Sequence, residues 1–143
     1  MSVATRLNLS HRVFFHPFVP HSELGELLVD ANVAIGLYAP FDVNNRTPSP
    51  NKVFESMAYG LPVVVTAGNS IADDVIAAHA GLAVALGSRE ALADALRRLL
   101  DDGPFAERCR ASARNAHLRE FNYETQLQNT LLGSLFPVVQ ATP

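Results

Sequence analysis

Apolar residues along the chain follow two alternating patterns. Short continuous apolar runs, such as PVVVT at 62–66 and GLAVAL at 81–86, predict buried strands. Between these runs, apolar residues recur at every third or fourth position, which predicts helices that pack by one face. The segment SREALADALRRLLDD at 88–102 is an example. The pattern predicts strands at 12–18, ending near His16, and at 33–38, 62–66 and 81–86, and helices at 22–31, 51–59, 71–80, 88–102, 104–121 and 123–136.

Strands that alternate with helices indicate a parallel sheet with helices on both faces. We therefore expect an α/β fold: a single, partial Rossmann-like domain over residues 1–143, with closing helices at 104–136. Ligands in such folds bind beyond the carboxyl ends of the strands. The loops that follow His16, Tyr38, Thr66 and Leu86 are the ones to consider.

Composition excludes several classes of protein. The 143 residues are 48% hydrophobic and carry a net charge of −3, which argues against binding to the nucleic-acid backbone. The amino-terminal residues lack the apolar run of a signal peptide, and no segment approaches the roughly 20 apolar residues of a membrane span. The single cysteine, Cys109, permits no intrachain disulfide and has no base nearby in sequence. We expect a cytoplasmic protein.

Two charges stand out in the segment TPSPNKVFESMAYG at 47–60. Ser49 can cap the predicted helix, and Pro50 suits its first position. A helix amino terminus attracts anions, and Lys52 adds a cation there. Glu55, one turn further, can accept two hydrogen bonds from a ribose diol. The alternative is a plain i, i+3 ion pair between Lys52 and Glu55. The polar side of this helix is expected to comprise Asn51, Lys52, Glu55, Ser56 and Tyr59.

Other candidate sites are weaker. His11, His16 and His21 are evenly spaced but straddle a strand and a turn, so we expect no metal site. Asp73 and Asp74 stand at the start of a predicted helix, where acids stabilise the dipole. The chain contains neither a Walker A motif nor G-x-G-x-x-G, which argues against a P-loop NTPase and a standard dinucleotide site.

The segments PNKVFESMAYGLPVVVT, AGNSIADDVIAAHAGLAVAL, REALADALRRLLDD and RASARNAHLREFNYE, in this order, carry a resemblance to a known family. They resemble the donor-binding half of GT-B-fold, nucleotide-sugar-dependent glycosyltransferases of group 1. The resemblance covers about residues 11–136. It implies transfer of a sugar from a nucleotide-diphosphate sugar to a polysaccharide, lipid or other acceptor, with no separate cofactor.

The resemblance also implies roles for individual residues. Glu55 matches the ribose-binding glutamate, and Lys52 is implied to contact the phosphates or the sugar. The remaining donor-binding candidates are Asn51 and Ser49 beside them, His16, Pro17 and Phe18 in the loop for the base, and Gly68, Asn69 and Ser70 near the phosphates or the sugar. Thr47 occupies the position of a second family glutamate that contacts the sugar, so the resemblance does not imply that contact for this chain. No catalytic residue is assigned.

The start of the resemblance has consequences for the fold. The family's first two strand–helix units and its acceptor-binding domain are not matched, so we expect the chain to be inactive alone, although the complete enzyme would work at the inner face of the membrane. Strands in the family follow the order 3-2-1-4-5-6. The strand at 33–38 would then have an exposed edge, which favours self-association or direct pairing with the strand at 12–18. Alternative functions are a non-catalytic nucleotide-binding or interaction module, and part of a GT-B nucleotide-sugar epimerase.

Overall fold

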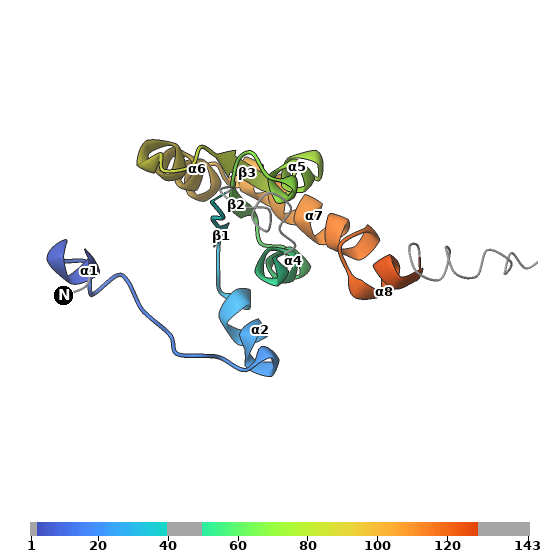
Figure 1. Ribbon diagram of the computed structural model, residues 1–143, viewed down its shortest axis with the longest axis horizontal. Helices are drawn as coiled ribbons and strands as arrows, with labels where there is room; N and C mark the ends of the chain where they lie inside the picture. Colours follow the sequence, from blue (N-terminus) through green and yellow to red (C-terminus); the bar gives the residue numbers. More distant parts are fainter. Residues whose placement is uncertain (1–2, 40–49, 129–143) are drawn as a thin grey trace, which may run out of the picture.

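The computed structural model describes residues 3–39 and 50–128 (Figure 1). Helices and strands alternate through most of this part of the chain. No helix in these two ranges is both long and apolar enough to cross a lipid bilayer. The elements are α1 (Val3–Arg6), α2 (His21–Val29), β1 (Ala34–Gly36), α4 (Asn51–Ala58), β2 (Val63–Thr66), α5 (Ser70–Ala77), β3 (Gly81–Val84), α6 (Arg89–Asp101), α7 (Gly103–Arg119) and α8 (Tyr123–Gln126).

The three strands form one parallel sheet in the order β1-β2-β3. Ala34 lies opposite Val63, and Val63 in turn lies opposite Gly81. All four residues of β2 are buried, as expected for a central strand that is covered on both faces. The α/β fold class and the parallel arrangement of the three strands are confirmed.

Helices cover both faces of this sheet. Val63 and Val65 of β2 belong to a core cluster that includes residues of α4, α5 and the second half of α7. Val64 points to the other face, where α6 and Cys109 of α7 pack. Helix α7 therefore contributes to both cores, and its buried positions are all small residues: Ala106, Cys109, Ala113 and Ala116. Small residues let the helix lie close to its neighbours, and Arg114 also donates a hydrogen bond to the Ala58 carbonyl of α4.

The expected strand at 12–18 is absent. Residues 13–20 form neither a helix nor a strand, and Phe14, Phe15 and Phe18 are exposed. The prediction was wrong because an apolar run becomes a strand only beside a partner, and the segment lies away from the sheet (Figure 1). Direct pairing of this segment with β1 is likewise not formed. Helix α2 begins one residue early, at His21, and the side chain of its N-cap residue Pro20 makes no capping bond.

The end of α5 yields a testable prediction. Ala80 N–H donates to the Val75 carbonyl and His79 N–H to the Ile76 carbonyl, which is a Schellman motif. His79 sits at the left-handed position of this motif with φ 53°. Because glycine adopts that conformation without a Cβ clash, we expect His79→Gly to raise the free energy of unfolding by about 0.5–1 kcal/mol. Urea denaturation would measure the gain. His79→Ala should show none, and an equal gain for Ala would contradict the explanation.

Candidate functional site

A cavity of about 700 Å³ lies along the outer face of α4. Its volume falls in the range of small-molecule sites, and its wall combines aromatic side chains with polar ones. Four further parts of the structure contribute: α2, α5, α7 and the segment that includes α8. The lining residues are His21, Leu24, Asn51, Phe54, Glu55, Ala58, Tyr59, Asp74, His117, Phe121, Asn122, Tyr123 and Gln126.

Helix α4 presents one continuous face to the cavity. Its lining residues, from Asn51 to Tyr59, are spaced by three or four positions, which places them on the same side of a helix. Val53 and Met57 face the opposite way and are buried in the core. One expectation is corrected here: Ser56 does not belong to the polar side. It is buried, and its Oγ donates to the Lys52 carbonyl at 2.6 Å.

Glu55 is the central polar group of this face. Its side chain is 28% exposed, and Oε1 lies 3.2 Å from Nε2 of His21 at the start of α2. Helix α2 lies against the end of α4 at Gly25, where a Cβ would lie 2.5 Å from the Tyr59 hydroxyl. The imidazole of His21 is 85% exposed, so the contact with Glu55 contributes little to stability and can be replaced at small cost.

Lys52 points elsewhere. Its Nζ lies 4.7 Å from the centre of the Tyr38 ring, within the range of a cation–π contact. Tyr38 follows β1, and its N–H donates to Thr66 Oγ1 at the end of β2. Lys52 therefore stands at the carboxyl edge of the sheet, whereas Glu55 pairs with His21. The alternative considered from the sequence, an i, i+3 ion pair between Lys52 and Glu55, is not formed.

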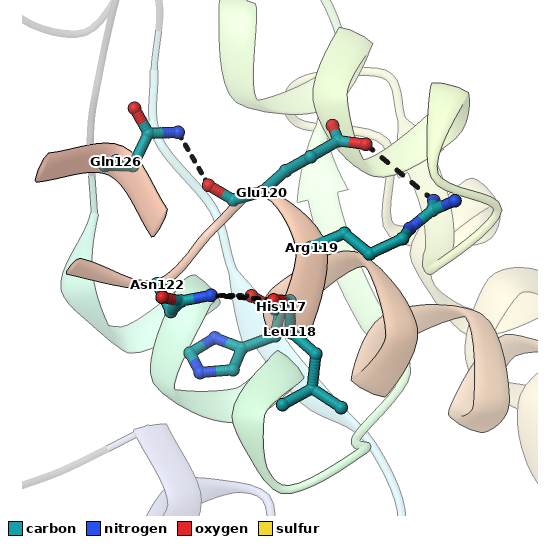
Figure 2. A network of polar contacts seen from close by, with 6 residues as sticks. All are labelled: His117, Leu118, Arg119, Glu120, Asn122 and Gln126. Atoms are coloured by element: carbon teal, nitrogen blue, oxygen red, sulfur yellow. Dashed lines mark hydrogen bonds and ion pairs between the residues drawn. The ribbon is translucent and has the colours of Figure 1, made fainter. Parts of the chain in front are cut away.

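The far wall of the cavity is the corner between α7 and α8 (Figure 2). Asn122 joins the two helices: its Nδ2 donates to the carbonyls of His117 and Leu118, and its Oδ1 accepts from Thr125 N–H. Gln126 reaches back to the Glu120 carbonyl at 2.6 Å. These bonds hold Phe121 in place, where its ring stacks on Phe54 of α4 at 5.3 Å between centroids.

Burial shifts the pKa of two titratable groups of the wall toward the uncharged form. Burial, followed by the charges of Asp73 and Glu120, raises the pKa of Asp74. Burial and the charge of Arg114 lower the pKa of His117, against the opposing effects of a hydrogen bond with the Phe54 backbone and of Glu124. Nδ1 of His117 is buried and has no hydrogen-bond partner. Among the described lining residues there is no Lys or Arg, so the cavity suits a ligand portion without negative charge.

The structure brings together only some of the residues predicted from the sequence. Glu55 and Asn51 line the cavity; His16, Pro17 and Phe18 do not. Gly68, Asn69 and Ser70 also lie outside it. Asn69 caps α5 by accepting from Ala72 N–H at 3.0 Å, and its Nδ2 is buried without a partner. Ser49 and Thr47 fall outside the described residues, and Pro50 is the N-cap residue of α4 rather than its first residue.

The contribution of the carboxyl-terminal helices to the cavity was not predicted from the sequence. Asp74 was interpreted as a helix-capping acid, and His117, Phe121, Asn122 and Gln126 were not considered for the site. One signal was available. Asparagine is a favoured N-cap residue, and Asn122 directly precedes the helix predicted at 123–136. Of the three evenly spaced histidines, only His21 reaches the cavity. Within residues 3–39 and 50–128 no three potential ligands gather into a metal site.

Comparisons with known proteins place this geometry in context. The family model described as "Glycosyl transferases group 1" matches residues 2–116. Among solved structures, the fold is similar to sucrose-phosphate synthase from Thermosynechococcus elongatus, with a TM-score of 0.71 and 28% sequence identity. The match covers 94% of this chain and 33% of that one, so the chain spans about a third of the length of its structural relative. A search of curated proteins found no match.

Proposed function

Because the chain belongs to the family of group 1 glycosyltransferases, we propose that it binds the nucleotide-sugar donor of a glycosyl transfer reaction. In this proposal the nucleoside occupies the cavity along α4. The observation that carries it is the position of Glu55, a partly exposed carboxylate on a cavity wall that also offers aromatic rings and polar side chains.

The chemistry of a nucleoside fits that wall. A ribose diol can donate two hydrogen bonds to one carboxylate. Because His21 is exposed, the diol can replace it as the partner of Glu55. The stacked pair Phe54–Phe121 and the ring of Tyr123 offer apolar surface for a base. A diphosphate would be repelled near Glu55, where the described lining offers no Lys or Arg, and would be attracted by Lys52 and the amino terminus of α4. The sugar and its acceptor then lie beyond the carboxyl edge of the sheet.

Loss of the Glu55 carboxylate should weaken binding of the nucleotide. We expect Glu55→Ala to reduce the affinity for UDP or GDP at least about tenfold, because charge-assisted hydrogen bonds are worth about 1.5–3 kcal/mol each. Isothermal titration calorimetry on the chain, and on the complete enzyme where it is longer, would measure the change. Glu90→Ala on α6, away from the cavity, is the matched control. Equal affinities for Glu55→Ala and Glu90→Ala would remove Glu55 from the site.

Lys52 should act on the phosphates alone. We expect Lys52→Gln to weaken binding of UDP several-fold more than binding of uridine, because only the diphosphate carries charge near Nζ. Titration of both ligands into wild type and variant would give the two ratios. A loss of the same size for uridine and UDP would show instead that the variant disturbs the Tyr38 contact and the start of α4.

A further inference from the structure

One buried polar atom of the cavity wall has no hydrogen-bond partner. In the described part of the chain two side-chain atoms are in this position, Nδ2 of Asn69 and Nδ1 of His117. Of these two residues, only His117 lines the cavity. A buried polar atom without a partner destabilises the folded protein, so a partner is usually supplied by the protein itself, by ordered water or by a ligand.

The other ring nitrogen of His117 is already engaged. The side chain forms a hydrogen bond with the Phe54 backbone that favours the protonated ring, so the imidazole is the donor and the Phe54 carbonyl is the acceptor. Because Nδ1 has no partner, the donor is Nε2. A neutral imidazole has one N–H and one acceptor nitrogen, which leaves Nδ1 with a lone pair. Burial and the charge of Arg114 lower the pKa of His117 and so favour this neutral form.

The polar side chains that share this wall with His117 are bonded to the backbone. Nδ2 of Asn122 donates to two carbonyls of α7, and its Oδ1 accepts from the N–H of Thr125 (Figure 2). Gln126 donates to the Glu120 carbonyl. None of these bonds reaches Nδ1, so its acceptor capacity is left for a group that enters the cavity.

His117 lies next to the part of the wall that would hold the base of a nucleoside. Its imidazole bonds to the backbone of Phe54, the residue before Glu55, and the ring of Phe54 stacks on Phe121. In the function proposed above, Glu55 holds the ribose and the stacked rings offer surface to the base. Because the base is joined directly to the ribose, its polar edge can then face Nδ1.

We propose that Nδ1 of His117 accepts the ring imino N–H of the base, which is N3–H in uracil and N1–H in guanine, and thereby selects these two bases. This inference rests on the proposed function and adds the identity of the base to it. In cytosine and adenine the corresponding ring nitrogen carries a lone pair, which would face the lone pair of Nδ1. A site that is built to bond an N–H group strongly rejects a ligand that lacks it.

Methylated nucleotides test the proposal on the unaltered chain. Isothermal titration calorimetry would compare UDP, GDP, CDP and ADP, and then N3-methyl-UDP or N1-methyl-GDP, whichever corresponds to the tighter ligand. We expect that ligand to bind at least about tenfold more tightly than CDP, ADP and its own methylated form. Equal affinity for the methylated and unmethylated nucleotide would overturn the proposal without the need for a variant.

His117→Phe separates the hydrogen bond from the bulk of the added methyl group. The variant keeps a planar ring but lacks Nδ1, so we expect methylation to weaken binding less than about threefold. His117→Asn places an amide oxygen near the position of Nδ1 and should restore part of the discrimination. Each ratio compares two ligands on one protein sample, so it does not depend on a change in stability. An unchanged ratio in His117→Phe would overturn the proposal.

Glu55→Ala distinguishes this proposal from the proposed function. If Glu55→Ala loses affinity for the nucleotide but methylation has no effect on wild type, the cavity binds the nucleotide and His117 does not select the base. If neither Glu55→Ala nor methylation changes the affinity, the nucleoside does not occupy the cavity, and both proposals are overturned.

Discussion

Gly81→Ala is expected to prevent the chain from folding. Gly81 starts β3 opposite Val63, and a Cβ at this position would lie 1.8 Å from the Val63 carbonyl oxygen and 2.8 Å from its nitrogen. Both atoms are backbone at the centre of the sheet and cannot move without breaking the β2–β3 pairing. We expect a loss of about 4 kcal/mol or more, against a total stability of about 5–15 kcal/mol for ordinary domains. Soluble yield and urea denaturation would measure it.

Gly103→Ala is the control for this prediction. Gly103 is the first residue of α7, and a Cβ there would meet nothing within 4 Å. We expect this variant to unfold at nearly the same urea concentration as wild type, since alanine is also the better helix former. Similar behaviour of the two variants would show that the β2–β3 distance adjusts more easily than the steric argument allows.

Ala113→Leu is expected to have the second largest effect. Ala113 of α7 is fully buried in the core cluster that also contains Val53 and Met57 of α4. Leucine adds three carbon atoms at a fully buried position between α7 and α4, so α7 or its neighbours must shift to admit it. Overpacking of this kind costs about 1–3 kcal/mol, and we expect the upper end because Ala113 is fully buried within the core cluster. Thermal denaturation followed by circular dichroism would report the loss.

The same substitution at Ala111 separates packing from helix propensity. Ala111 lies on α7 two residues earlier and is exposed, so leucine there has nothing to displace. We expect Ala111→Leu to change stability by less than about 0.5 kcal/mol. Because α7 also carries His117 and leads into Phe121, a shifted α7 in Ala113→Leu should weaken nucleotide binding as well. If Ala113→Leu lost stability but kept its affinity for the nucleotide, the shape of the cavity would not depend on the α4–α7 contact.

Most of the central fold could be predicted from the sequence because local patterns there agree with the final packing. The segment at 88–102 was predicted to be a helix and forms α6, which Ser88 caps by accepting from Ala91 N–H with its Oγ at 3.1 Å. The apolar run at 62–66 became a buried central strand. In both cases the residues that decide the structure are close together in the chain.

The errors arose where a residue depends on distant neighbours. RVFFH has the composition of a strand, but sequence composition does not supply the partner that a strand requires. Lys52 and Glu55 share one side of a helix, yet each found a better neighbour outside it, in Tyr38 and His21. Packing of α7 on α4 creates the cavity wall that contains His117, Phe121 and Asn122. No spacing of residues in the sequence predicts that contact between the two helices.

Hydrogen exchange at strand β2 would report the global stability of the domain without denaturant. All residues of β2 are buried, and the strand lies between β1 and β3. Its backbone N–H groups can therefore exchange with solvent only when the domain unfolds. Amides of β1, at the sheet edge, can exchange through local opening. The slowest hydrogen-exchange rates should therefore cluster at Val63–Val65 and report the unfolding equilibrium of the whole domain. The difference between β2 and β1 would measure how much less it costs to open the edge than to unfold the protein.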